Sequence, residues 1–362
     1  MDDPKSLLDP NARLADVDRP PAGRRGRLLE FTALTSGICV LAISLVVTTC
    51  LGAHAGLGWP EVGRVVGFHV GLAVEPLPPL VDALIWDVRI PRVLTAALVG
   101  AALAVSGAAL QAITRNSLAD PYIMGVSAGA STGAVAVVVL GFAGSQLGTT
   151  GGAFVGALMS VVLSMLLLRR STHKAMRIIL TGVVVGQLFS ALTSLILMAS
   201  GDADSTRALT HWLLGSMASA RWHSVVICLI AFGVVFAVLW SCVPALDCFA
   251  FGTDTASSMG INVAATRAVL LISTSLLTAV SVAQVGVIGF VGLIVPHTVR
   301  LLLGSLHQVL LPMAAVVGAV FMLWSDALAR VVFAPLEVPV GVVTALLGVP
   351  QFLLILRSRG ER

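Results

Sequence analysis

Long uncharged runs alternate with short polar segments along almost the whole chain. Eight runs can be followed: 31–60, 93–114, 121–168, 178–201, 222–246, 268–299, 301–325 and 338–356. A helix of about 20 apolar residues crosses the roughly 30 Å hydrocarbon core of a bilayer, so each run is long enough for a crossing. The pattern predicts an all-α, polytopic membrane protein.

Two of the runs are too long for one crossing. The run 121–168 contains a stretch rich in Gly, Ser and Thr at 141–152, and such stretches mark breaks between helices. The run 268–299 carries Gly286, Gly289 and Gly292, which predict a turn between two helices. Splitting both runs gives about ten transmembrane helices.

The second predicted helix is unusually rich in small residues between Gly100 and Ala109. Gly, Ala and Ser let helix backbones approach closely in lipid, so this helix is expected to lie inside the bundle. The run from Trp222 to Trp240 is rich in large apolar residues, and we expect it to face lipid.

Composition supports this class of protein. The chain is 57% hydrophobic and 11% charged, against about 25% charged residues in soluble domains. Its net charge of +4 does not indicate nucleic-acid binding, because the basic residues form no stripe interleaved with aromatics. The five cysteines show no CxxC spacing and the seven histidines no paired spacing, so neither a metal site nor a resident cofactor is expected.

The distribution of Lys and Arg predicts the orientation. With the N-terminus inside, 16 of the 22 basic residues fall on the inner side, so the positive-inside rule places both termini in the cytoplasm. Residues 1–27 are then a disordered cytoplasmic tail, 28–358 the membrane domain, and 359–362 a short C-terminal tail.

Catalytic chemistry is missing from the sequence. No P-loop is present, and Lys5 and Lys174, the only lysines, follow no glycine loop, so the chain is not expected to bind ATP or to act as an enzyme. Asp326 and Arg330 are four residues apart on the ninth helix and can pair. The middles of the other spans are uncharged, which disfavours a stand-alone secondary transporter, because such a carrier needs a coupling-ion site at mid-membrane.

The inner segment 247–266 differs from the other connections. Its composition predicts short helices broken at Gly252 and Gly260, with Thr253 or Thr255 as a cap. A compact helical loop of this kind is a candidate docking surface for a soluble partner. By its physics alone, a plain linker is an equal alternative.

Several blocks in register carry a family resemblance. In order they are RIPR, LVGAALAVSGAALQAITRNSLADP, GVSAGA, WLLGS, GFVGLIVPH and LEVPVGVVTALLGVPQF. From about Phe31 to Arg357 the chain resembles the permeases of bacterial ABC importers for iron-siderophores, haem and cobalamin (FecCD-type, type II). The resemblance implies ten helices per subunit and a second permease subunit, identical or paralogous. It also implies two cytoplasmic ATPase subunits that bind ATP and Mg²⁺, a substrate-binding protein, and a location in the bacterial cytoplasmic membrane.

The resemblance also implies roles for particular residues. Outward-facing arginines, here Arg89, Arg92 and Arg330, would dock the binding protein; the alternative is that Arg92 only snorkels at a helix end. A weaker match places a cytoplasmic gate at Ala175 and Met176. The positions that match the ATPase coupling loop are Ala250, Phe251, Gly252, Ala256, Met259, Gly260 and Ile261.

The resemblance leaves the cargo open. The segment GDADSTRALTHWLLGSM looks most like the siderophore permeases, which favours ferric siderophore. Haem and cobalamin remain alternatives.

Overall fold

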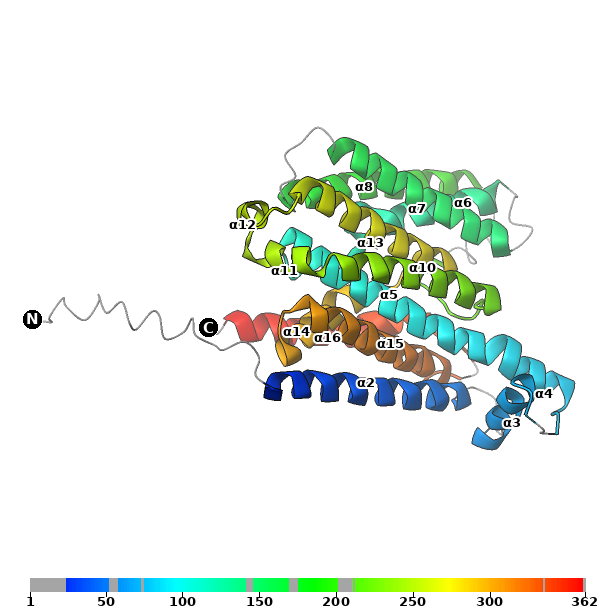
Figure 1. The fold of residues 1–362 in the computed structure, drawn as a ribbon. Coiled ribbons are helices and arrows are strands. Elements are labelled where there is room, and N and C mark those ends of the chain that lie inside the picture. The colour runs from blue at the N-terminus through cyan, green and yellow to red at the C-terminus, as the bar shows by residue number, and fades with distance from the viewer. Residues whose placement is uncertain are drawn as a thin grey trace, which may run out of the picture.

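The computed structural model describes residues 24–51, 58–72, 75–140, 146–168, 175–200, 210, 212–334 and 336–360, and all regular secondary structure in these ranges is helical. Figure 1 shows the helices packed side by side as a bundle. The main helices are α2 (Arg24–Cys50), α5 (Ile90–Thr114), α6 (Val126–Val139), α7 (Gln146–Leu168), α8 (Ala175–Ser200), α10 (Trp222–Ser241), α13 (Val263–Val285), α14 (Val291–Leu303), α15 (His307–Val331) and α16 (Val340–Gly360).

Shorter elements lie between the main helices. They are α3 (Trp59–His69), α4 (Pro79–Ala83), the π-helix η2 (Leu84–Arg89), the 3₁₀-helix η3 (Pro121–Met124), α11 (Val243–Phe251) and α12 (Thr253–Ser258). The predicted tail 1–27 lies mostly outside the described residues, and helix α2 already begins at Arg24.

Seven helical stretches are long and apolar enough to cross a membrane, and α6, α14 and the apolar part of α16 are shorter apolar helices. In chain order they follow the ten predicted helices, so the all-α polytopic class is confirmed. The number of full crossings stays a prediction, because the 13 residues of α14 rise only about 20 Å.

Both predicted splits are present. Helix α6 ends at Val139 and α7 begins at Gln146, while α13 ends at Val285 and α14 begins at Val291. The second break needs left-handed backbone at Gly286 (φ 76°) and at Phe290 (φ 71°). Glycine adopts this conformation without steric cost, which explains why the glycine pattern located the break.

Helix α5 is the buried centre of the bundle, as its small residues predict. Of the 18 most apolar consecutive residues in the span 79–114 that contains it, 83% are buried. The corresponding share for α10 is 28%, so that helix is largely exposed, as expected. A Cβ on Gly107 would lie 1.9 Å from the carbonyl oxygen of Gly292 in α14, and one on Gly100 would lie 2.2 Å from that of Gly318 in α15. The missing side chains therefore set the distance between α5 and two neighbouring helices.

The helical stretch around α5 starts earlier than predicted. The uncharged run begins at Val93, but α4, η2 and α5 continue one another from Pro79 to Thr114. Charged residues of this extension, such as Asp87 and Arg89, ended the apolar run without ending the helix.

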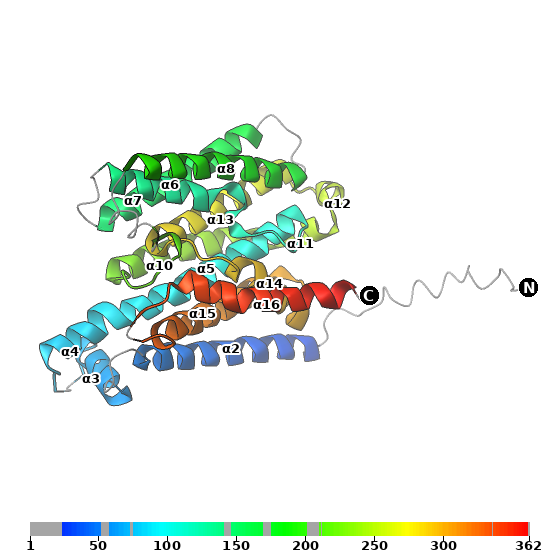
Figure 2. The same cartoon turned by 180° about the vertical axis from the view of Figure 1, so that it is seen from behind.

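The two ends of the bundle carry different elements. Helix α12, the start of α2 and the end of α16 lie at one end, called the inner end below (Figures 1 and 2). Helices α3 and α4 lie at the opposite, outer end. There Val62 and Val65 of α3 pack with Ile85 of η2 in a small apolar core of their own.

Candidate functional site

A buried cluster of ions joins three elements at the outer end. The Arg92 guanidinium on α5 donates to Asp326 on α15 through Nε (3.0 Å) and Nη2 (2.9 Å), and through Nη1 to both carboxylate oxygens of Glu337 (3.0 Å each). Bidentate Arg–carboxylate pairs are among the stronger and more specific hydrogen bonds in proteins. Arg92 thus ties α5 to α15 and to the segment that precedes α16.

Two further arginines at this end of the bundle donate hydrogen bonds to backbone carbonyls at the C-terminus of α2. Arg330 pairs with Asp326 (Nε to Oδ2, 3.0 Å) and donates to the carbonyl oxygens of Leu51 and Thr48, while Arg89 donates to that of Thr49 (3.4 Å). The last carbonyls of a helix have no partner within it and carry partial negative charge. The arginines therefore neutralise the C-terminus of α2.

Arg89, Arg92 and Arg330 lie at the end of the bundle where they were predicted, but they are only 5–7% exposed and hydrogen-bonded inside the chain. Nor does Arg92 snorkel at a helix end, because two carboxylates hold it. The predicted pair of Asp326 with Arg330 is confirmed. The role of the arginines in docking a binding protein stays a prediction.

Three non-helical segments meet deeper in the bundle. The amide of Ser216 donates to the carbonyl of Val285 (2.8 Å), and the amide of Val340 donates to the carbonyl of Gly215 (3.0 Å). Non-helical backbone at membrane depth is stable only where it is buried in protein or lines a cavity. These bonds join the breaks before α10, after α13 and before α16.

Tyr122 satisfies further open backbone in the break between α13 and α14. Its hydroxyl donates to the carbonyl of Ile288 (2.9 Å) and accepts from the amide of the same residue (3.1 Å). One side chain of η3 thus replaces both hydrogen bonds that Ile288 loses where α13 and α14 are interrupted.

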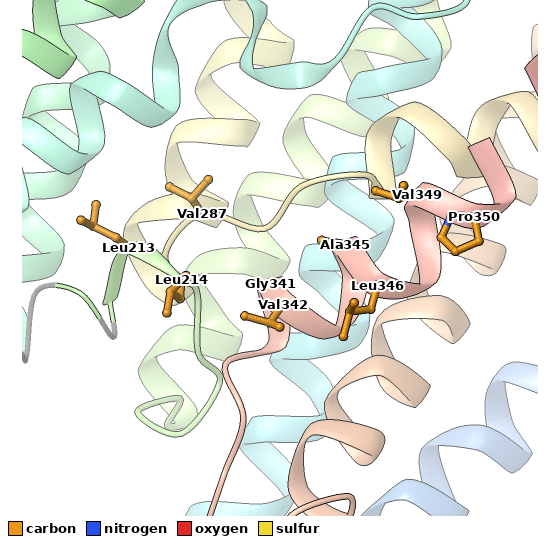
Figure 3. Close-up of a pocket in the computed structure, with 9 residues that line it drawn as sticks. All are labelled: Leu213, Leu214, Val287, Gly341, Val342, Ala345, Leu346, Val349 and Pro350. Carbon is orange, nitrogen blue, oxygen red and sulfur yellow. The ribbon is translucent and has the colours of Figure 1, made fainter. Parts of the chain in front are cut away.

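An open groove of about 560 Å³ lies where these segments meet (Figure 3). Figure 3 shows the lining side chains coming from the segment before α10, from the α13–α14 break and from the first turns of α16. The lining residues are Leu213, Leu214, Val287, Gly341, Val342, Ala345, Leu346, Val349 and Pro350. Because all of them are apolar, this wall offers contact area but no charged or hydrogen-bonding side chain to hold a polar ligand.

At the inner end, the predicted coupling loop folds as short helices. Helices α11 and α12 are separated at Gly252 (φ 118°), and the chain turns again at Gly260 (φ 83°), as predicted. The predicted cap is wrong: Gly252 occupies the N-cap of α12, and the Thr255 hydroxyl donates back to the carbonyl of Phe251 (3.3 Å).

The predicted coupling residues divide by exposure. Ala256 is fully buried and Gly252 is buried, while Ala250 and Gly260 are exposed and Ile261 is partly buried. The two large apolar side chains at the tip, Phe251 and Met259, are 77% and 65% exposed. Large apolar groups that remain exposed outside the membrane spans are typical of a contact surface for another protein.

A hydrogen-bonded pair fastens this loop to the bundle. The Asp247 carboxylate on α11 accepts from the backbone N–H (2.9 Å) and the ring Nδ1 (2.6 Å) of His307, the first residue of α15. The first amides of a helix have no partner within it, so Asp247 supplies a cap from another element. Helix α15 is thereby held to α11 at its inner end and to the ion cluster at its outer end.

This pair predicts a pH dependence of stability. Burial alone would raise the pKa of the Asp247 carboxyl, but hydrogen bonds from His307 outweigh it and hold the pKa below the ordinary value of 3.8. The stabilisation is therefore fully present above pH 3.8 and is lost as the pH falls through the lower, folded-state pKa. In thermal unfolding, Asp247→Ala should lose about 1 kcal/mol at neutral pH, and the difference from the unaltered protein should shrink in acid.

Asp254→Ala is the matched control, because Asp254 is exposed on the neighbouring helix α12. Equal losses for the two variants, or a difference independent of pH, would contradict the capping role of Asp247.

The predicted gate lies at the start of α8. Met176 is 73% exposed. Ala175 is the first residue of the helix. Its side chain and residues 169–174 lie outside the described part of the chain. The gating role of both residues stays a prediction.

Within the described residues, no three His, Cys, Asp or Glu side chains come together in a way that could hold a metal ion. The expectation that this chain carries no resident cofactor stays a prediction.

Sequence reasoning missed Glu337, Asp247 and His307. Each is a polar residue that borders an apolar helix, and this was the available signal. Their partners lie 245 and 60 residues away in the chain, so no local spacing revealed the pairs.

The comparisons with known proteins agree with this arrangement. A model of the FecCD transport family matches residues 28–358. The chain is 38% identical to the uncharacterized ABC transporter permease protein YvrB of Bacillus subtilis, over 92% of this chain and 96% of that protein. It is 37% identical to the cobalamin import system permease protein BtuC of Halobacterium salinarum, over 93% of this chain and 90% of that protein.

A solved structure has the same fold. It is titled as an inward-facing conformation of a putative metal-chelate type ABC transporter, and it superposes with a TM-score of 0.78 at 32% identity, covering 90% of this chain and 98% of that one. Since the family match covers nearly the whole chain and the relatives align over almost their full length, the protein belongs to the FecCD transport family and is an ABC importer permease, a transport subunit without catalytic activity of its own.

Proposed function

We propose that this chain is the membrane-spanning subunit of an ATP-driven importer in the cytoplasmic membrane of a bacterium. The exposed apolar tip of the inner loop, Phe251 and Met259, carries the proposal, because a carrier that works alone has no use for such a surface. Two soluble ATPase subunits, which bind ATP and Mg²⁺, would receive this tip. A stand-alone secondary transporter is disfavoured, since the ion cluster lies at the outer end rather than at mid-membrane.

A second permease subunit, identical or paralogous, would complete the pathway. The groove along α16 is open on one side, and its apolar wall suits a bulky cargo that slides past without tight binding. A substrate-binding protein would deliver the cargo at the outer end, near Arg89, Arg92 and Arg330.

The proposed cargo is a bulky metal complex. The name of the Halobacterium salinarum relative, a cobalamin import permease, supports cobalamin, and so does a vitamin B12 import permease of Vibrio cholerae that is 39% identical over 76% of this chain. The likeness of the segment before α10 to siderophore permeases supports ferric siderophore, and haem is the third candidate. We place cobalamin first, because the relatives match over most of the chain.

Binding assays test the cargo. The purified substrate-binding protein of the same transport system would be titrated with cobalamin, haemin and ferric siderophores. We expect tight binding of cobalamin alone. If a ferric siderophore bound in preference to cobalamin, the proposed cargo would be ferric siderophore instead.

Coupling to the ATPase gives a sharper test. Met259→Glu places a charge on the exposed apolar tip, so we expect cargo uptake to fall at least about tenfold, because loss of one interfacial contact is worth 1–2 kcal/mol or more. Uptake and ATP hydrolysis would be measured on the complex in proteoliposomes. Met259→Leu, which stays apolar, is the control and should transport normally. Normal uptake by Met259→Glu would contradict the coupling role.

Docking at the outer end is tested at Arg92. Arg92→Lys keeps the charge but cannot bond two carboxylates in bidentate fashion. If this cluster docks the binding protein, association should slow by roughly threefold or more, because charged groups at an interface mainly set the association rate and the register. Arg221→Lys, at the start of α10, is the control; equal rates for the two variants would contradict docking through Arg92.

A further inference from the structure

The outer ion cluster contains one carboxylate that can be exchanged. The side chains of Arg92, Arg330 and Asp326 are 9%, 6% and 1% exposed, so these three groups are covered while Glu337 is in place. The side chain of Glu337 is 43% exposed. A partner that approaches from the outer side therefore meets Glu337 first.

Glu337 is also the least anchored member of the cluster. It lies on the non-helical segment between α15 and α16, and within the described residues its carboxylate is hydrogen-bonded to Arg92 alone. Asp326, by contrast, bonds both Arg92 and Arg330 from within helix α15. Because Glu337 is partly exposed and another carboxylate takes its place on Arg92, its release leaves no buried charge unpaired and costs little.

The charge of the cluster favours such an exchange. Arg92 and Arg330 pair with the two carboxylates, while Arg89 is bonded, among the described residues, only to the carbonyl of Thr49. The three guanidinium groups and two carboxylates therefore leave one positive charge in excess. An acidic partner is attracted by this excess, and its carboxylate can form the same two hydrogen bonds with Nη1 of Arg92 that Glu337 forms now.

We propose that Glu337 is an internal substitute for a partner's carboxylate: it occupies Nη1 of Arg92 in the free permease and gives way to a carboxylate of the docking protein. The inference rests on the proposed docking at the outer end and explains how arginines that are buried in the free chain can take part in it.

The exchange has a consequence for the groove. Three residues beyond Glu337, the amide of Val340 is bonded to Gly215, and Gly341 and Val342 line the groove. Release of Glu337 removes one of the contacts that hold the start of α16, so docking at the outer end loosens the groove wall.

The test is the association rate of the purified substrate-binding protein of the same transport system with the complete transporter in nanodiscs. Glu337→Gln removes the competing charge, and we expect association about fivefold faster, because the partner's carboxylate no longer competes with a charged group on Arg92. Glu75→Gln is the matched control, because Glu75 is an exposed outer-end carboxylate close to Arg64. It makes the same change in net charge and should alter the rate much less.

The same substitution in the Arg92→Lys variant shows whether the faster association depends on Arg92. In Arg92→Lys, Glu337→Gln should accelerate association far less than in the unaltered protein, because the bidentate site is already lost. Equal acceleration by Glu75→Gln and Glu337→Gln would overturn the inference, as would slower association of Glu337→Gln. If the binding protein does not associate with the unaltered transporter, the docking function itself is wrong.

Discussion

Asp326→Ala is expected to destabilise the protein by about 3–5 kcal/mol, because it leaves buried guanidinium groups without their main counter-ion. Asp326 is 1% exposed. Its carboxylate accepts hydrogen bonds from Arg92 on α5 and forms an ion pair with Arg330 on its own helix. After the substitution, Arg330 would keep, among the described residues, only backbone carbonyls, those of Thr48, Leu51 and residue 326, and Arg92 would keep only Glu337. Thermal unfolding in detergent measures the loss.

Asp87→Ala is the control for this substitution. Asp87 lies on η2 at the same end of the molecule, but its side chain is exposed. Its removal should change the unfolding temperature very little, since exposed substitutions away from such networks are usually within about 0.5 kcal/mol. If Asp326→Ala unfolded at the same temperature as Asp87→Ala, the cluster would not hold α5 to α15.

Gly107→Ala is the second substitution with a large expected effect. The new Cβ would lie 1.9 Å from the carbonyl oxygen of Gly292 and 2.7 Å from its Cα, and both are backbone atoms that cannot rotate away. Helices α5 and α14 would have to separate. Overpacking typically costs about 1–3 kcal/mol and occasionally more, and we expect the upper end because two backbones collide. Poor recovery of monodisperse protein and a lower unfolding temperature are the readouts.

Gly233→Ala separates this effect from the intrinsic preference for helix. Gly233 lies in α10, is exposed, and has nothing within 4 Å of the position of an added Cβ. Alanine favours helix over glycine by about 1 kcal/mol, so this variant should be as stable as the unaltered protein or more so. A Gly107→Ala protein as stable as Gly233→Ala would show that α5 and α14 are not in close contact.

The sequence predicted features whose cause is local. The order of the helices followed from apolar runs, the break between α13 and α14 from Gly286, and the breaks around α12 from Gly252 and Gly260. The pair of Asp326 with Arg330 followed from helix geometry, since residues four apart lie on one face. Burial of α5 followed from its small residues, because only backbones without bulky side chains approach closely in lipid.

Local reasoning failed wherever a charged residue found a distant partner. Arg89 and Arg92 mark the end of an apolar run, and a charge at such an end normally reaches for water. Here the C-terminus of α2, Asp326 and Glu337 surround them instead. The predicted threonine cap of α12 failed because Gly252, with its positive φ, already forms the turn.

By itself, then, the sequence determined that this chain is a bundle of membrane helices, where those helices break, and which of them lies at the centre. These properties depend on the length and periodicity of apolar runs and on the size of side chains, which neighbouring residues record. Only the tertiary structure decided that Arg92 bonds both Asp326 and Glu337, that Asp247 caps α15, and that three broken segments form one groove. Such contacts join residues tens to hundreds of positions apart, and their energy depends on burial and geometry that arise only when the helices pack.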